Sequence, residues 1–299
     1  MRRFTNPLES AIDIRHYLLG AMVIVFGLVI LSPFLVDLIK NAVSPKGADI
    51  ENLSKYLSRN AFFLVNMSPF VIGFVSIVFC SRVIFHRPLK TFITARPQFD
   101  FKRFFFSFGL WSVLMLTSFF LTFIKSNHQL VWNFQSEKFF YLLIIAALFI
   151  PVQTGFEEIF FRGFLLQLFG KITQKGIYLV LITGTLFGAL HLMNPEIEKL
   201  GLFAVIYYII SGLFTTLIVI LDDGTELSWG FHLANNLFGI IIVTNEWQAL
   251  QTDALFVDVS PPAPGWDMYV TMFLLYPLMI FVFYLVYQWK NWKKVLFKS

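Results

Sequence analysis

Three ionisable residues stand close together inside an otherwise apolar stretch of this sequence. Glu157, Glu158 and Arg162 fall in FEEIFFRGFLLQLFG, residues 156–170. An ionisable side chain at membrane depth costs at least about 2.5 to 3.5 kcal/mol on insertion scales, so groups of this kind usually serve a function. Two carboxylates beside a guanidinium could supply a base for proton transfer and an ion pair that positions it.

Helical spacing separates the roles of these three residues. Glu158 and Arg162 are four residues apart with the acid first, the order that favours an ion pair on a helix, although such a pair can also be purely structural. Glu157 is turned about 100° away from Glu158, so we expect it to be free of that pair. A carboxylate without a charged partner in a poorly solvated site suits a general base. We therefore predict that Glu157 is the catalytic base.

Two of the five histidines also fall inside apolar stretches. His191 ends the segment FGALH and His232 begins HLANN, in which Asn236 lies four residues later, on the same face of a helix. From a rise of 1.5 Å per residue, we expect Glu157 and His191 about 18 and 22 Å from the cytoplasmic ends of their helices. His232 and Asn236 would lie about 9 and 15 Å from the cytoplasmic end of their helix. These depths are compatible with one polar cluster in the cytoplasmic half of the membrane or near its midplane.

The elements that must position these residues are membrane-spanning helices. The 299 residues are 57% hydrophobic and 14% charged, with a mean hydropathy of +0.72, whereas soluble domains carry about 25% charged residues. Eight segments have the length of a bilayer span, at about 17–36, 61–81, 104–124, 139–155, 177–193, 201–221, 227–245 and 268–288. No barrel-like alternation is present, so we expect an all-α polytopic membrane protein forming a single domain, 1–299.

The basic residues predict an orientation. Apart from Arg162 of the acidic motif, 15 of the other 22 lysines and arginines lie on the side of the two termini, and only Lys40, Lys46, Lys55, Arg59, Lys125, Lys138 and Lys199 lie on the other. By the positive-inside rule, both termini are expected in the cytoplasm. The net charge of +5 therefore reflects topology, and no nucleic-acid partner is expected. We expect an integral protein of the plasma (inner) membrane of a prokaryote.

Three short motifs resemble those of the CPBP intramembrane proteases, a family that includes type II CAAX prenyl endopeptidases, bacteriocin-processing enzymes and Abi self-immunity proteins. The motifs are Glu-Glu-x-x-x-Arg at Glu157, Glu158 and Arg162, Phe-x-x-x-His at Phe187 and His191, and His-x-x-x-Asn at His232 and Asn236. The resemblance covers about 139–245, which we interpret as the catalytic core. Residues 1–138 would then be N-terminal helices outside the motif region, and 246–299 an outer loop, a last helix and a basic cytoplasmic tail.

The resemblance implies a helical core whose polar cavity opens toward the cytoplasm. It also implies that Glu157 and His191 hold and deprotonate the attacking water, while His232 and Asn236 stabilise the oxyanion, with Glu158, Arg162 and Phe187 in support. The cofactor is either none or a divalent metal such as zinc, with Glu157, His191 and His232 as candidate ligands. The sequence lacks His-Glu-x-x-His, which favours the metal-free mechanism.

The leading hypothesis is an intramembrane endopeptidase that acts on membrane-associated peptides or proteins. The alternative is a non-catalytic self-immunity protein or membrane scaffold, for which substitutions at Glu157 and His191 would leave the phenotype intact. A proton-coupled transporter is disfavoured because the chain shows no internal repeat and no broken-helix pattern. The sequence does not identify the substrate.

Overall fold

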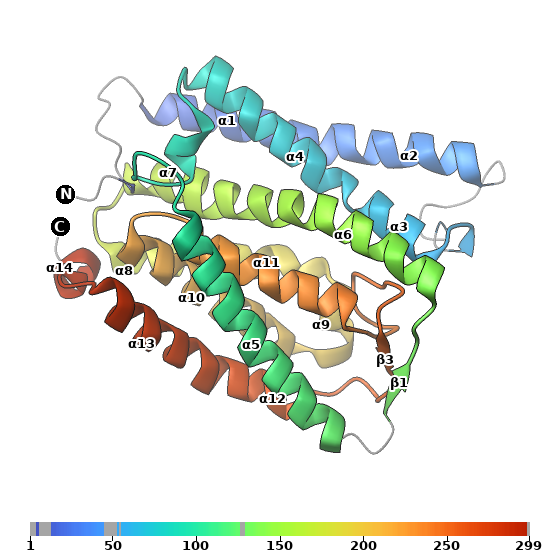
Figure 1. Ribbon diagram of the computed structural model, residues 1–299. Helices are drawn as coiled ribbons and strands as arrows, with labels where there is room; N and C mark the ends of the chain where they lie inside the picture. Colours follow the sequence, from blue (N-terminus) through green and yellow to red (C-terminus); the bar gives the residue numbers. More distant parts are fainter. Residues whose placement is uncertain (1–3, 6–12, 45–52, 54, 126–128, 298–299) are drawn as a thin grey trace.

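The computed structural model describes residues 4–5, 13–44, 53, 55–125 and 129–297, and these form a bundle of long helices (Figure 1). Seven helical segments are long and apolar enough to cross a membrane. They are Ile14–Val43, Arg59–Ile84, Phe101–Lys125, Ser136–Gly170, Gly176–Met193, Leu202–Asp222 and Trp266–Tyr287. Each coincides with a span expected from the sequence, so the all-helical polytopic membrane fold is confirmed.

Several spans combine α-helix with short 3-10 or π-helical turns. The helical elements are α1 (Ile14–Phe26), η1 (Gly27–Leu31), α2 (Ser32–Val43), α3 (Arg59–Asn66), α4 (Ser68–Phe79), η3 (Cys80–Ile84), η4 (Leu89–Phe92), α5 (Phe101–Lys125), α6 (Ser136–Glu157), η5 (Glu158–Leu165), α7 (Leu166–Gly170), α8 (Gly176–Leu190), η6 (His191–Met193), α9 (Pro195–Leu200), α10 (Leu202–Asp222), α11 (Glu226–Ile241), α12 (Trp266–Val270), η7 (Thr271–Leu275), α13 (Tyr276–Tyr287) and α14 (Trp292–Phe297). Three short strands complete the described chain: β1 (Leu130–Trp132), β2 (Val243–Thr244) and β3 (Phe256–Asp258).

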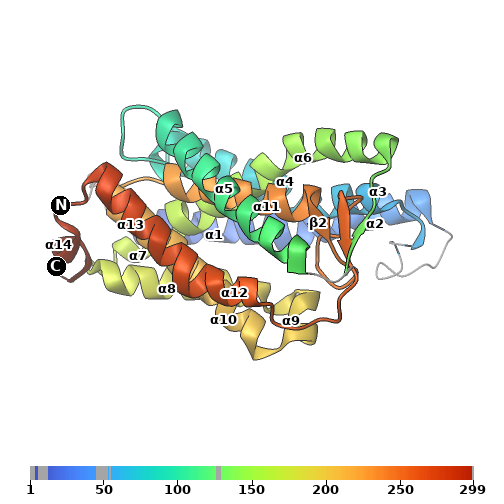
Figure 2. The same cartoon turned by 60° about the horizontal axis from the view of Figure 1, so that its bottom comes forward.

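The eighth expected span, 227–245, corresponds to α11, which is shorter than the other seven. Its 16 residues rise about 24 Å, less than the roughly 30 Å of a hydrocarbon core. It packs against α5, α6 and α10 in the middle of the bundle (Figures 1 and 2), and most of its first nine residues are buried. A short helix shielded by its neighbours need not meet the bilayer on its own, and this one carries His232 and Asn236.

The two ends of the bundle differ in structure. Both chain termini lie at one end, where Phe4 and Leu296 pack in the same apolar cluster (Figures 1 and 2). At the other end the three strands form a small sheet in the order β1-β3-β2. In this sheet β1 pairs antiparallel with β3, placing Val131 opposite Val257, and β2 pairs parallel with β3. These two ends are called the termini end and the sheet end below.

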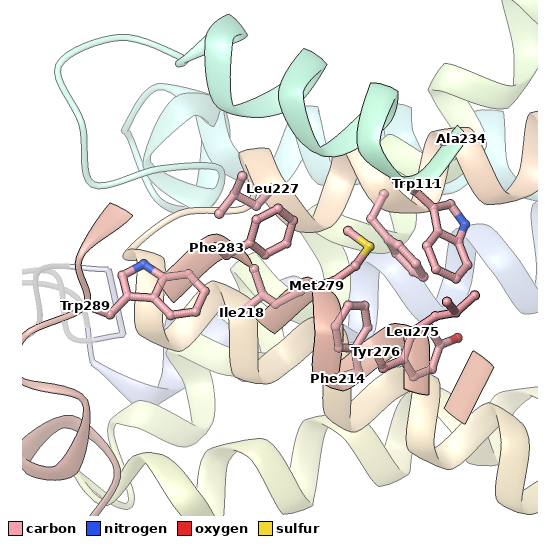
Figure 3. Close-up of a cluster of buried hydrophobic side chains, with 11 residues drawn as sticks. Trp111, Phe214, Ile218, Leu227, Ala234, Leu275, Tyr276, Met279, Phe283 and Trp289 are labelled. Atoms are coloured by element: carbon pink, nitrogen blue, oxygen red, sulfur yellow. The ribbon is translucent and has the colours of Figure 1, made fainter. Parts of the chain in front are cut away.

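An aromatic cluster holds α5, α10, α11 and α13 together (Figure 3). The rings of Phe214 and Tyr276 stack with their centroids 4.2 Å apart, and Trp111 packs beside Phe231 at 4.6 Å. Packing of this kind, rather than the hydrophobic effect, associates helices within lipid. The cluster fixes α11 and thereby the position of His232.

Glycines bring α8 and α10 into unusually close contact. A Cβ atom on Gly212 of α10 would lie 2.2 Å from the backbone oxygen of Gly184 on α8. One turn further along α8, a Cβ on Gly188 would lie 2.6 Å from Ile209. Small residues four apart allow helix backbones to approach closely in membranes. This contact sets the distance between α10 and the α8 residues Phe187 and His191.

Gly212→Ala is therefore expected to force the two helices apart. We predict a loss of about 1 to 3 kcal/mol, the usual cost of overpacking, measured as a lower thermal unfolding midpoint in detergent or lipid. The matched control is Gly109→Ala, because a Cβ atom on this glycine of α5 meets nothing within 4 Å. Equal unfolding midpoints for the two variants would show that the α8–α10 contact is not tight.

Candidate active site

The helix that carries the acidic motif changes its winding at the motif itself. Ser136–Gly170 is a continuous 35-residue span, but Glu158–Leu165 within it is π-helical, with α-helix on either side. The sequence analysis assumed α-helical winding throughout. Short π-helical segments occur frequently at functional sites because they redirect side chains that an α-helix would place elsewhere. Gly163 fits here because a Cβ atom would lie 2.0 Å from the backbone oxygen of Phe92.

The predicted ion pair between Glu158 and Arg162 is present and fully buried. Arg162 Nη1 lies 3.1 Å from Glu158 Oε1, and both side chains have no exposed surface. Arg162 Nη2 also donates to Thr215 of α10, and the guanidinium lies over the ring of Phe187 at 4.0 Å from its centroid. Ser228 of α11 donates to the second oxygen of Glu158. The pair therefore ties η5 to α8, α10 and α11.

Glu157 lies outside the Glu158–Arg162 ion pair, as helical spacing predicts, but it is not without partners as that spacing suggested. Gln153 Nε2, one turn earlier on α6, donates to Glu157 Oε1 at 2.7 Å. The second oxygen, Oε2, lies 3.4 Å from His232 Nε2. Helical periodicity considers neighbours on the same helix, so it could separate Glu157 from Arg162 but could not anticipate a partner on α11. The carboxylate is oriented by an amide and an imidazole rather than by a cation.

Gln153 is a site residue that the sequence analysis missed. Its amide joins two motif residues, because Nε2 donates to Glu157 and Oε1 accepts from Asn236 Nδ2 at 2.8 Å. The available signal was an amide side chain four residues before the predicted base, in a largely apolar segment. It belongs to none of the three motifs, so resemblance alone did not select it.

His232 bridges the two glutamates. Its Nδ1 lies 2.9 Å from Glu158 Oε1, and its Nε2 faces Glu157 as described above. Glu158 already accepts from Arg162 and Ser228, so it is held as an acceptor and His232 Nδ1 carries a proton. Asn236 Nδ2 lies 3.4 Å from His232 Nε2, which places the amide of Asn236 beside the same nitrogen. A proton can therefore pass between His232 Nε2 and Glu157.

His191 lies at the end of α8 and is held from two sides. Its Nδ1 is 2.8 Å from the backbone oxygen of Phe187, which can only accept, so Nδ1 is the donor. Its ring stacks on Tyr208 of α10, with centroids 4.3 Å apart. In the neutral ring, Nε2 is then left as an acceptor. Phe187 thus positions Arg162 with its ring and His191 with its carbonyl.

These side chains surround one cavity of about 520 Å³, which we call the chamber. Six of the seven motif residues line it, namely Glu157, Arg162, Phe187, His191, His232 and Asn236. Glu158 lies behind this lining, where it orients His232. Three separate segments of the sequence thus meet around one space that can hold water and a peptide.

The metal-ligand set left open by the sequence is not assembled in this geometry. Within the described ranges, no group of three or more His, Cys, Asp and Glu side chains is placed to hold a metal ion. His232 Nδ1 is engaged by Glu158, its Nε2 is faced by an amide, and His191 is turned to a backbone oxygen and a tyrosine ring. Glu157, His191 and His232 are therefore not placed together as the ligands of a metal ion in this geometry.

We predict that Gln153→Met lowers the turnover rate of any reaction at this site without unfolding the protein. In this variant Glu157 and Asn236 lose their common hydrogen-bond partner. Loss of a hydrogen bond to a charged group costs about 1.5 to 3 kcal/mol, which corresponds to a turnover rate lower by about 10- to 100-fold. Turnover and unfolding midpoint are measured on the same preparation. Thr154→Val is the control, since Thr154 is buried on the same helix but bonds Trp229 and lies outside the chamber lining. Equal rates for the two variants would remove Gln153 from the site.

Comparison with known proteins agrees with the motifs. Residues 136–238 match the model of the type II CAAX prenyl endopeptidase Rce1-like family. This match covers about a third of the chain. The matched segment contains α6 to most of α11 and every motif residue. The segment similar to this family therefore supplies most of the chamber lining.

One curated relative is similar to this chain over a longer stretch. The uncharacterized protein YyaK of Bacillus subtilis (strain 168) is 34% identical over 192 residues, which is 64% of each of the two chains. The match therefore spans less than two thirds of that relative's length. No solved structure matches the chain.

Proposed function

We propose that this protein is an intramembrane endopeptidase that hydrolyses peptide bonds of membrane-associated substrates. The observation that carries the proposal is the meeting of Glu157, His191 and the pair His232 and Asn236, from three helices, around one chamber, within the segment that is similar to the Rce1-like family. A lone buried carboxylate has many uses. A carboxylate flanked by two imidazoles and two amides in a cavity is suited to activate water and stabilise an oxyanion.

Glu157 acts as the general base in the proposed mechanism. A water molecule in the chamber gives a proton to Glu157 as its oxygen forms a bond with the carbonyl carbon of the substrate. The acceptor nitrogen Nε2 of His191 holds the second proton of that water. Gln153 keeps Oε1 of Glu157 occupied, so Oε2, beside His232, is the oxygen that takes the proton. When the C–N bond breaks, Glu157 returns the proton to the leaving amine.

Asn236 and His232 stabilise the oxyanion in this proposal. The Nδ2 group of Asn236 and Nε2 of His232 lie 3.4 Å apart, so both can donate to one oxygen atom when the His232 ring carries a proton on each nitrogen. The ring of His232 is fixed by Glu158, which is itself fixed by Arg162 and Ser228. Donors held in this way are effective because they need no reorganisation during the reaction, and one such donor is typically worth about 100- to 1,000-fold in rate.

The proposed substrates are peptides or proteins that enter from the bilayer. The chamber combines the polar site with apolar walls from Leu28, Phe70 and Leu190, which suit a membrane-anchored chain. The family description names prenylated CAAX substrates, and leader peptides or membrane-protein tails would fit the same walls. The similarity to a Bacillus protein supports the plasma membrane of a prokaryote as its location.

The proposal is tested by comparing membrane and secreted peptides from cells that carry the native protein with those from cells that carry Glu157→Gln. An endopeptidase predicts that uncleaved precursors accumulate in the variant and that their fragments disappear. A non-catalytic immunity protein or scaffold predicts unchanged peptides and an intact protective phenotype, and that result would overturn the proposal. The amount of inserted protein is measured in both strains, so that loss of the protein is not read as loss of activity.

A further inference from the structure

The chamber reaches only one end of the bundle. Its lining includes Asn194 and Glu196, around the start of α9, together with the loop segment 248–250. Glu196 Oε1 accepts from the backbone of Ala249 at 2.9 Å, which joins the two segments at the mouth. Both segments lie toward the sheet end in Figures 1 and 2. The chamber therefore opens toward the sheet end.

The termini end of the chamber is closed by buried ionic side chains. Directly behind the site lies the Glu158–Arg162 pair, which has no exposed surface. Beyond it, Asp222 at the end of α10 accepts from Arg96 and Arg103, and Glu226 at the start of α11 accepts from Arg96. The carboxylates of this second layer are buried as well. In the described part of the chain, no residue of the termini-end connections lines the chamber.

The distribution of positive charge assigns a side of the membrane to each end. The described basic residues at the termini end include the cluster Arg82, Arg87, Lys90, Arg96, Lys102 and Arg103, followed by Lys171, Lys175, Lys290, Lys293 and Lys294. Among the residues that the structure describes, the sheet end carries only Lys40, Lys55, Arg59, Lys125, Lys138 and Lys199. By the positive-inside rule, the termini end is cytoplasmic and the sheet end is extracytoplasmic. The mouth of the chamber and the cytoplasm therefore lie on opposite sides of the membrane.

We propose that the chamber is entered from the extracytoplasmic face, so that the substrate is a membrane-anchored peptide whose cleaved segment lies outside the cytoplasm. The identity of that substrate rests on the proposed peptidase function, but the direction of access does not. Resemblance implied a cytoplasmic opening. A cytoplasmic opening and cytoplasmic termini cannot both be correct, because the mouth of the chamber and the termini lie at opposite ends of the bundle.

The proposal is tested by labelling single cysteines with a membrane-impermeant maleimide. The only native cysteine, Cys80, is buried and is first replaced by alanine. Three variants then carry one new cysteine each: Glu198→Cys beside the mouth, Ala249→Cys on the chamber lining, and Asn291→Cys after α13. Glu198 and Asn291 are both exposed, so they report the two faces of the membrane.

In intact cells, we expect Glu198→Cys and Ala249→Cys to react with the maleimide and Asn291→Cys to remain unlabelled until the membrane is permeabilised. The reverse pattern would overturn the proposal, because it would place the mouth in the cytoplasm. If Ala249→Cys accumulates poorly, Glu198→Cys reports the same face.

Access to the depth of the chamber is tested with Ser211→Cys, a nearly isosteric change on the chamber wall. A small charged methanethiosulfonate added outside intact cells should modify it. Modification only from the cytoplasmic side of inverted vesicles would contradict the proposed access. These labelling experiments need no substrate, so their failure is distinct from retained cleavage by Glu157→Gln, which would contradict the peptidase function alone.

Discussion

Replacing Glu157 with glutamine is expected to abolish peptide hydrolysis while leaving the protein folded and inserted. Glutamine has the shape of glutamate but cannot accept a proton from water, and loss of a general base typically costs about 100- to 10,000-fold in rate. The variant keeps an oxygen near Gln153 and a polar atom near His232, so the surrounding structure should persist. Turnover is measured on purified protein in lipid, together with the unfolding midpoint.

The matched control for this change is Glu137→Gln. Glu137 lies on the same helix, α6, but is exposed in its first turn and far from the chamber lining. It should retain the native rate. A Glu157→Gln protein that cleaves at the rate of this control would remove Glu157 from the role of base and leave His191 and His232 as the remaining candidates for proton transfer.

Replacing Arg162 with methionine is expected to give the largest loss of stability. The change leaves Glu158 buried without its cation, and breaking a buried ion pair in this way costs about 3 to 5 kcal/mol. Thr215 and Phe187 lose their contacts with the guanidinium at the same time. The unfolding midpoint in lipid or detergent is the measurement. The control is Arg59→Met, whose partner Glu246 is 3.8 Å away and exposed, for which a loss below about 1 kcal/mol is expected.

The double variant Glu158→Met with Arg162→Met separates stability from activity. Replacing both members of a buried ion pair by apolar residues is often neutral or stabilising, so most of the lost stability should return. Activity should stay low, because His232 no longer has Glu158 to fix its ring. Recovery of full activity in the double variant would show that the pair only holds the helices together.

Much of this site followed from local sequence rules. Apolar segment length identified all seven long spans, and the i, i+4 rule paired Glu158 with Arg162 because both interactions lie within one helix. The depth estimates placed His191 and His232 at levels compatible with Glu157, and both line the chamber with it. These features depend on distances along the chain, which the sequence contains directly.

Features that depend on packing between helices could not be predicted from the sequence. Helical spacing left Glu157 without a partner, whereas His232 reaches it from α11 and Gln153 ties it to Asn236. The π-helical winding of η5, which contacts η4 and α8, was also not predicted, because no local sequence pattern records it. The end of the bundle at which the chamber opens could not be predicted from the sequence either, because segments 194–196 and 248–250 meet only in the folded protein.

Cleavage in water labelled with oxygen-18 tests the central claim most directly. Purified native protein in lipid is incubated with candidate membrane-anchored peptides, and the new carboxyl termini are examined by mass spectrometry. If Glu157 activates water for peptide hydrolysis, the native protein produces new carboxylates that contain the heavy oxygen, and Glu157→Gln produces none above background. Labelled termini formed equally by both proteins would contradict the account, because the hydrolysis would then not depend on Glu157.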